Sequence, residues 1–296
     1  MMKQVIGDAV TVRFFMPSPQ LAPYFTTFYL TEVKVPAGEE VEDWLHPEWA
    51  NVRFAQSPNM RAAIGTEPLR TAPRMIATGP TSLAGHFVSG PFRNWGIGIQ
   101  PLGWARFCNG PAADLADTFC DGADCAAFAA FAPLQDLIYA DEPEPAAEAA
   151  RIDAFLLSLL DQRPPAEDEA RIHAAHTALM DQEVGSVGEL AERLGMSPRS
   201  LERLSLRAFG FSPKLLLRRQ RFLRSLSQFM LDPSLTWIRT LDWQYVDQAH
   251  FVRDFKRFMG MSPSQYAAQD HPVLRAAARA RAAAAGAAVQ ILHTPG

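Results

Sequence analysis

The feature of this sequence that most constrains its fold is an internal repeat near its C-terminal end. At an offset of 50 residues, Arg203 falls on Arg253 and Gly210 falls on Gly260, and each glycine is followed two residues later by Ser-Pro. Glycine can close a helix in the left-handed conformation, and Ser-Pro favours the start of the next helix. Because a solenoid needs about three repeats, two copies predict a pair of helical units instead.

The first unit has the local signals of two helices joined by a tight turn. Ser186 and Glu189 form a capping box ahead of an amphipathic stretch at 187–194. The pair 197–198, Ser-Pro, then opens a second helix over 199–209. Its apolar residues share one face and its long polar side chains share the other, which predicts a helix-turn-helix with an exposed recognition helix.

The second unit repeats this arrangement, with Asp247 as the expected N-cap of its outer helix. Between the units, residues 212–230 predict one long helix with apolar and basic faces. At about 1.5 Å per residue it spans roughly 28 Å, near the ~34 Å between successive major-groove faces of DNA. Both units could therefore meet the same side of one duplex.

The charge of the chain is divided between its two halves. Residues 1–180 carry 12 Lys+Arg against 22 Asp+Glu, whereas residues 181–296 carry 16 against 10. Between Arg193 and Arg257 there are 13 basic and 5 acidic residues, a surplus of +8. This surplus indicates a polyanionic partner and predicts that log affinity falls against log salt with a slope of about −5 to −8.

Residues 183–268 resemble the DNA-binding domain of the AraC family, which consists of two helix-turn-helix units on a connecting helix. The segment 245–258, YVDQAHFVRDFKRF, followed by Gly-Met-Ser-Pro at 260–263 and by Tyr266, is similar to the family signature. The resemblance implies sequence-specific binding to double-stranded DNA and recruitment of RNA polymerase. It implies base contacts from Arg199, Ser200, Glu202, Arg203, Gln248, His250 and Arg253. Arginine suits guanine, glutamine suits adenine, and glutamate can accept from cytosine.

Phosphate contacts are expected from the basic side chains that flank these positions and from the helix N-termini. The candidates are Arg207, Lys214, Lys256 and Arg257.

The acidic half predicts antiparallel sheet. Short β-branched and aromatic runs occur at 10–15, 25–35 and 97–100, between turn signals such as Gly-Pro. The resemblance implies a small barrel that senses an effector or dimerises, so we expect a small-molecule effector and a homodimer as further partners.

One alternative interpretation is an enzyme. His46, Glu48 and His86 have the residue types of a two-histidine, one-carboxylate metal site, so a cupin-like metal-dependent enzyme with a DNA-binding module is the second hypothesis. These residues do not share one strand face by periodicity, and we expect no metal, no cofactor and no catalytic residue. A further alternative is an oligomerisation scaffold that binds no DNA.

The expected fold class is a multidomain α+β protein. It comprises a β-rich barrel-like domain at 1–140, a helical connector at 146–182, an all-α double helix-turn-helix domain at 183–270 and an alanine-rich helical tail at 271–296. The apolar stripe at 146–160 suits either a dimer interface or packing within the chain.

The cellular setting follows from what the sequence lacks. No run approaches the ~18 apolar residues of a membrane span, and the N-terminus does not resemble a signal peptide. The three cysteines are best explained as reduced thiols. We therefore expect a cytoplasmic protein.

Overall fold

The N-terminal half of the chain folds into two antiparallel sheets in the computed structural model, which describes residues 9–231 and 241–285. The larger sheet has the order β1 (Val10–Phe15), β2 (Phe25–Val33), β9 (Phe92–Ile99), β4 (Ala50–Gln56), β7 (Met75–Thr78) and β10 (Phe119–Asp121). The smaller sheet has the order β3 (Val41–Leu45), β8 (Gly85–Ser89), β5 (Arg61–Ile64) and β6 (Arg70–Thr71). The predicted β-rich character of the N-terminal region is confirmed.

Helices follow the strands in chain order. Those before the repeat are α2 (Pro101–Phe107), the 3-10 helices η1 (Ala112–Leu115) and η2 (Ala126–Phe131), α3 (Leu134–Leu137), α4 (Pro145–Gln162) and α5 (Glu169–Met180). The repeat contains α6 (Val187–Arg193), α7 (Pro198–Phe209), α8 (Pro213–Leu231), α9 (Gln248–Met259) and α10 (Pro263–Ala267), and α11 (Pro272–Ala285) comes last. The fold is therefore α+β, as predicted.

Two predicted segments fall partly outside the described residues. Residues 232–240 would hold the first helix of the second unit, and residues 286–296 would complete the tail.

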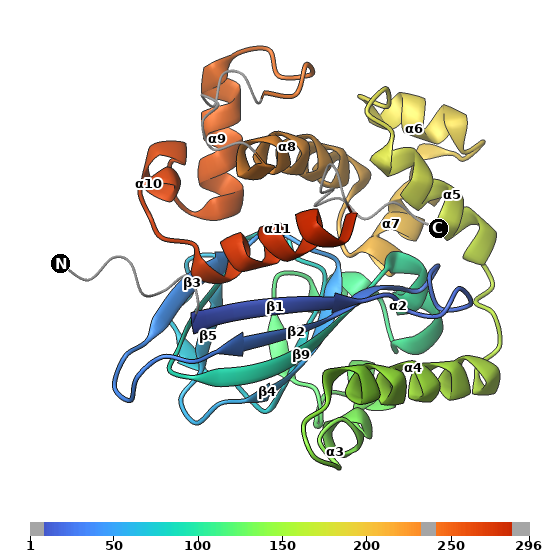
Figure 1. The fold of residues 1–296 in the computed structure, drawn as a ribbon. Helices are drawn as coiled ribbons and strands as arrows, with labels where there is room; N and C mark the ends of the chain where they lie inside the picture. Colours follow the sequence, from blue (N-terminus) through green and yellow to red (C-terminus); the bar gives the residue numbers. More distant parts are fainter. Residues whose placement is uncertain (1–8, 232–240, 286–296) are drawn as a thin grey trace.

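The helices lie above the strands, to their right and, for α3 and α4, at the lower right (Figure 1). In this view α8, α9 and α10 lie above the sheets, α5, α6 and α7 lie at the right, and α11 crosses between the strands and α8. The predicted tail helix is thus observed, and it packs against β1 and β3.

The first helix-turn-helix unit shares its core with the β domain. One continuous apolar cluster contains Phe54 and Trp95 of the sheet, Ile152 of α4, and Leu201 and Phe209 of α7. The second unit has a separate cluster, built on Phe222 of α8 and the phenylalanines of α9, with Ala84 of the β domain at its edge. The two repeats are therefore alike in sequence but are attached differently to the rest of the chain.

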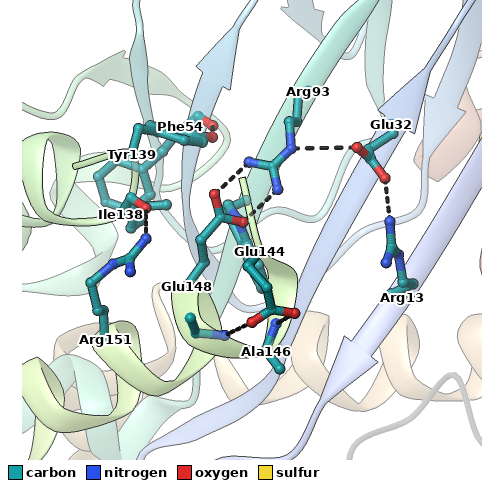
Figure 2. Close-up of polar contacts among 12 residues, drawn as sticks. Arg13, Glu32, Phe54, Arg93, Ile138, Tyr139, Glu144, Ala146, Glu148 and Arg151 are labelled. Carbon is teal, nitrogen blue, oxygen red and sulfur yellow. Dashed lines mark hydrogen bonds and ion pairs between the residues drawn. The ribbon is translucent and has the colours of Figure 1, made fainter. Parts of the chain in front are cut away.

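Helix α4 packs on the sheet of its own chain (Figure 2). Its N-cap Glu144 accepts hydrogen bonds from the amides of Ala146 and Ala147. One turn later Glu148 is fully buried, where it pairs with Arg93 and accepts from Trp95 Nε1 at 2.9 Å. Of the two uses predicted for this stripe, packing within the chain is the one observed.

Candidate DNA-binding surface and an adjoining cavity

The first recognition helix, α7, begins and ends as its sequence predicts. Ser197 caps it by accepting from the amide of Ser200, and Gly210 ends it in the left-handed conformation with φ of 83°. The preceding helix, α6, carries the predicted capping box. Local signals therefore fix both ends of the helix before any tertiary contact forms.

The outer face of α7 presents three of the predicted base-contacting residues. Arg199, Glu202 and Arg203 are exposed, while the opposite face is buried in the shared core. Ser200 is half-buried, and the Ser197 hydroxyl donates to its oxygen at 3.0 Å. The exposed side chains lie on the first turns of the helix, where a recognition helix meets base edges.

The second recognition helix, α9, is built in the same way. Asp247 accepts from the amide of His250 at 2.6 Å, and Gly260 ends the helix with φ of 73°. Gln248 and Arg253 are exposed. The inward phenylalanines and the N-cap predicted for this helix are both observed.

Two candidates are engaged within the chain. His250 is half-buried, accepts from Arg221 Nη2 at 3.2 Å and packs edge-on against Tyr245. It faces solvent less than predicted, because α8 approaches its ring. Arg207 pairs with Asp168 of the connector, which lowers the pKa of that carboxyl.

The remaining phosphate candidates, Lys214, Lys256 and Arg257, are exposed.

Asp254 holds the second recognition helix in place, a role that its sequence position did not reveal. It lies within the signature segment, yet its side chain is fully buried. It accepts from Arg218 Nε at 2.6 Å and from the Tyr245 hydroxyl at 3.0 Å, with Arg221 at 3.4 Å. Because the Asp254 carboxylate accepts hydrogen bonds from arginines of α8, it holds α9 against α8. The signal that could have found it was an acidic residue on an otherwise basic helix.

Ion pairs inside the second unit reduce the number of cationic side chains that can contact DNA phosphates. Arg218 and Arg221 pair with Asp254, and Arg224 pairs with Asp242. The surplus of +8 already subtracts Asp254 and Asp242, so these pairs leave the net charge as counted but reduce the number of arginines that are free to bind phosphates. The physical reason is that one face of α8 must hold the second unit.

Arg219 of α8 enters the β domain. Its side chain is 1% exposed, and its Nη1 donates to the backbone oxygens of Thr81 and Glu48 at 2.8 and 3.2 Å. Its guanidinium lies over Trp49, 3.9 Å from the ring centroid. Burial lowers the pKa of Arg219 to about 9, against the opposing effects of Asp117 and Glu48. The sequence placed this residue on a basic face.

The second unit contacts the β domain through polar groups. The amide of Ala84 donates to the carbonyl oxygen of Phe258 at 2.7 Å, and His46 Nε2 lies 2.7 Å from the Tyr266 hydroxyl. Burial lowers the pKa of His46 to about 3, so its ring is neutral. Both units therefore contact the β domain in this structure.

A cavity of about 260 Å³ lies where the β domain, α8 and α11 meet. Its wall is mainly apolar, as in most small-molecule sites. Helix α8 contributes Arg219, Gln220 and Leu223, and α11 contributes Val273 and Arg281. The DNA-binding half of the chain is thus part of the cavity wall.

The comparisons with known proteins bear on the repeat. Residues 190–269 match a family model described as a helix-turn-helix domain, which is of the AraC type. The chain is therefore a DNA-binding regulator with a helix-turn-helix domain of the AraC type at these residues. No curated protein sequence is similar enough to this regulator to match it.

Several solved structures of ToxT from Vibrio cholerae are similar to the regulator. One, in a P21 crystal form, is 11% identical with a TM-score of 0.43, and the match covers 77% of this chain and 97% of that chain. Another, bound to (E)-4-(8-methylnaphthalen-1-yl)but-3-enoic acid, is 10% identical with a TM-score of 0.45, covering 88% and 98%. A third, with an unsaturated fatty acid bound, is 10% identical with a TM-score of 0.42, covering 87% and 94%.

The residues suggested for a metal site serve other contacts in the regulator. His46 meets Tyr266, Glu48 pairs with Arg53, and His86 stacks on Trp44. Across the described residues, no group of three His, Cys, Asp or Glu side chains could hold a metal ion. Within the described ranges, 9–231 and 241–285, no helix is both long enough and apolar enough to cross a membrane.

Two of the cysteines, Cys108 and Cys120, do not suit reactive thiols. None of the three cysteines forms a disulfide, and burial raises the pKa of Cys108 and raises that of Cys120 to about 12.

Proposed function

We propose that the regulator places α7 and α9 in successive major grooves of one DNA site. The observation that carries this proposal is the matched construction of the two helices: each has a capped N-terminus, a glycine end and exposed donors on its outer face. Helix α8 joins them with 19 residues, about 28 Å of helix. That length is near the spacing of successive groove faces.

Base edges are read by the exposed residues of the two helices, and phosphates set the register. The proposed base contacts are Arg199, Ser200, Glu202 and Arg203 on α7, with Gln248, His250 and Arg253 on α9. The proposed phosphate contacts are Arg207, Lys214, Lys256 and Arg257. Arg207 and His250 reach DNA only after giving up their present partners, so we rank them behind the others.

The test of base readout uses one arginine from each helix. Arg203→Ala and Arg253→Ala should each cost about 1–3 kcal/mol on the selected target site and less on random DNA. The target site is found by in vitro selection, and affinity is measured by fluorescence anisotropy. Equal losses on target and random DNA would assign these residues to backbone contacts.

Regulation by a small molecule is the second part of the proposal. The cavity is walled by the β domain and also by the connecting helix of the DNA-binding domain, so an occupant contacts both. A ligand that binds one arrangement of the β domain and the DNA-binding domain more tightly than another favours that arrangement. The DNA affinity can change by no more than this difference in ligand-binding free energy. The AraC type further supports recruitment of RNA polymerase, a homodimer and a cytoplasmic location as expectations.

The test of regulation fills the cavity. Ala62, from β5, lines it, whereas Ala154 of α4 is exposed. We expect Ala62→Phe to change DNA affinity at least threefold and Ala154→Phe to leave it unchanged. Identical DNA affinity in both variants, with Ala62→Phe folded by circular dichroism, would count against control through the cavity.

A further inference from the structure

Exposed apolar side chains gather in and beside the turn that leads into α9. Among the described residues, five large apolar side chains are exposed, and two of them lie in this turn, Trp243 at 63% and Val246 at 87%. Ala249, in the first turn of α9, is exposed as well. These three residues form an apolar patch. Apolar residues exposed singly are ordinary on protein surfaces, whereas exposed patches mark sites of interaction.

The turn holds the patch in a defined conformation. The amide of Asp242 donates to Ser225 Oγ of α8 at 2.8 Å, and the Asp242 side chain pairs with Arg224. The amides of Gln244 and Tyr245 donate back to Asp242 at 2.9 and 3.0 Å. Tyr245 is buried in the core of the second unit. The fold of the turn therefore anchors this tyrosine and leaves its apolar neighbours in water.

The patch adjoins the residues proposed to read bases. Val246 directly precedes the N-cap of α9, and Gln248 stands between Val246 and Ala249 in the chain. Ala249 and Arg253 are four residues apart, so they share the helix face opposite the buried phenylalanines. The first turns of a recognition helix meet base edges. The patch is therefore continuous with the DNA-binding surface.

The charge around the patch favours a polyanion as its partner. On the same helix, Arg253, Lys256 and Arg257 are exposed. The carboxylate of Asp247 accepts from the amide of His250, so it is engaged as the N-cap. Phosphate groups are attracted to such a cationic surface. Duplex DNA therefore fits the surroundings of the patch better than an acidic protein surface that contacts no base.

Thymine is the base that an apolar side chain can recognise in the major groove. It presents an apolar C5-methyl group there, whereas the other groups on the base edges are hydrogen-bond donors or acceptors. Alanine makes such methyl contacts, and valine offers two methyl groups of its own. Gln248, which lies between them, suits adenine. Together these side chains suit A·T pairs in the half-site bound by α9.

We propose that the apolar patch contacts duplex DNA, with Val246 and Ala249 reading the methyl groups of thymines in the half-site bound by α9. Trp243, farther from the helix, packs against the sugar–phosphate backbone. This inference rests on the proposed placement of α9 in a major groove and adds the base that its half-site requires. Val246, Ala249 and Trp243 thus join the polar residues of α9 as DNA contacts.

The first test removes the methyl group from the DNA. Each thymine of the selected target site is replaced in turn by deoxyuridine, which keeps the hydrogen-bonding groups of thymine but lacks its methyl group. We expect at least one replacement to weaken binding of the wild-type chain by about fourfold, the change that burial of one methyl group supplies. Fluorescence anisotropy measures the affinity with regulator and DNA alone. If no replacement weakens binding, the reading of thymine is wrong.

The second test assigns the methyl contact to the patch. Val246→Ala and Ala249→Gly should each lose the deoxyuridine effect at one position of the site. The ratio of affinities for thymine and deoxyuridine DNA is taken within each variant, so a change in folding cancels. Met16→Ala, at an exposed apolar residue that follows β1, should keep the wild-type ratio at every position. If both patch variants also keep it at every position, the methyl contact belongs to other residues.

The third test concerns Trp243. Trp243→Ala should weaken binding to target and random DNA alike, by about threefold, because backbone contacts carry no sequence information. Unchanged affinity for both DNAs would contradict the backbone contact and would leave Trp243 as a surface for another protein.

Failure of this inference is distinguishable from failure of the proposed function. If Arg253→Ala weakens target binding more than random binding but no deoxyuridine effect depends on the patch, base reading by α9 stands and thymine reading is wrong. If the wild-type chain binds target and random DNA equally, the proposed function itself is wrong.

Discussion

The two helix-turn-helix units are near copies in sequence, but they are held by different physical means. The first shares one apolar core with the sheet and the connector, and α7 packs against η1 and α2. The second has a separate core, which reaches the β domain at Ala84 and the partly buried Trp44, and it also meets that domain through polar groups such as His46 and the amide of Ala84. Separating the first unit from the sheets would expose a large apolar surface to water, which costs much free energy. Hydrogen bonds contribute only about 1 kcal/mol each to the contact, because water replaces them when the surfaces part. The second unit is therefore the part of the regulator that is easier to move.

The largest effect should come from removing the apolar anchor of the first unit. Phe209 is fully buried and packs against Trp49 and His176. Phe209→Ala should cost about 3–5 kcal/mol of unfolding free energy and should loosen the β domain together with the first unit. Phe258→Ala, in the second core, is the matched variant and should affect only the second unit.

Chemical denaturation followed by tryptophan fluorescence and by hydrogen exchange separates these outcomes. If Phe258→Ala lowers the hydrogen-exchange protection of the strand amides as much as Phe209→Ala does, the two units are not held differently.

The next effect concerns the buried carboxylate of the second unit. Asp254→Asn should destabilise that unit by about 2–4 kcal/mol, because Arg218 and Arg221 lose a charged partner in a buried site. Asp270→Asn, which removes an exposed pair with Arg275, should cost less than ~1 kcal/mol. Thermal unfolding measures both variants. A similar loss in the two would show that the Asp254 network does not hold α9.

Acid should weaken the contact between the second unit and the β domain. His46 has a pKa lowered by burial to about 3, against an ordinary value near 6.5, so the unfolded chain binds the proton more readily. Stability therefore falls as the pH drops from about 6.5 towards 3, by on the order of 2 kcal/mol at pH 4.5. His46→Gln, which cannot be protonated, should reduce this slope in denaturation at pH 7 and pH 4.5. An unchanged slope in His46→Gln would remove His46 as its source.

The smallest effect is on the salt dependence of DNA binding. Because the arginines of α8 are engaged inside the domain, about five phosphates are neutralised and the slope of log affinity against log salt should be about −4 to −5. Lys214→Gln should make the slope shallower by about 1. Lys34→Gln, an exposed lysine of the β domain, should leave it unchanged. The measurement is anisotropy titration on the target site at several salt concentrations, and a slope near zero would contradict DNA binding through this surface.

Several structural details could be predicted because their causes are local. Ser197, Asp247 and the two glycines at 210 and 260 fix helix ends through hydrogen bonds and backbone conformations that need only neighbouring residues. The exposed faces of α7 and α9 follow from helical periodicity in the same way. Arg203 and Arg253 are exposed for this reason.

Other details could not be predicted, because they depend on which surface a helix meets. Arg219 is one basic residue among several on α8, and only the docking of that face on the β domain makes it a buried cation. The same holds for Asp43, whose partners lie about 230 positions further along the chain. Pairings at this separation leave no periodic signal.

The sequence by itself determined the repeat, its helix ends, the donors on its outer faces and the β-rich character of the acidic half, since each depends on short-range sterics and hydrogen bonding. Only the tertiary structure decided that one unit is joined to the sheets by a common core, that the other is joined by polar contacts and a smaller apolar contact at Ala84, and that α8 and α11 both contribute to the wall of one cavity. The reason is that burial depends on which residues, distant in the chain, exclude water from one another.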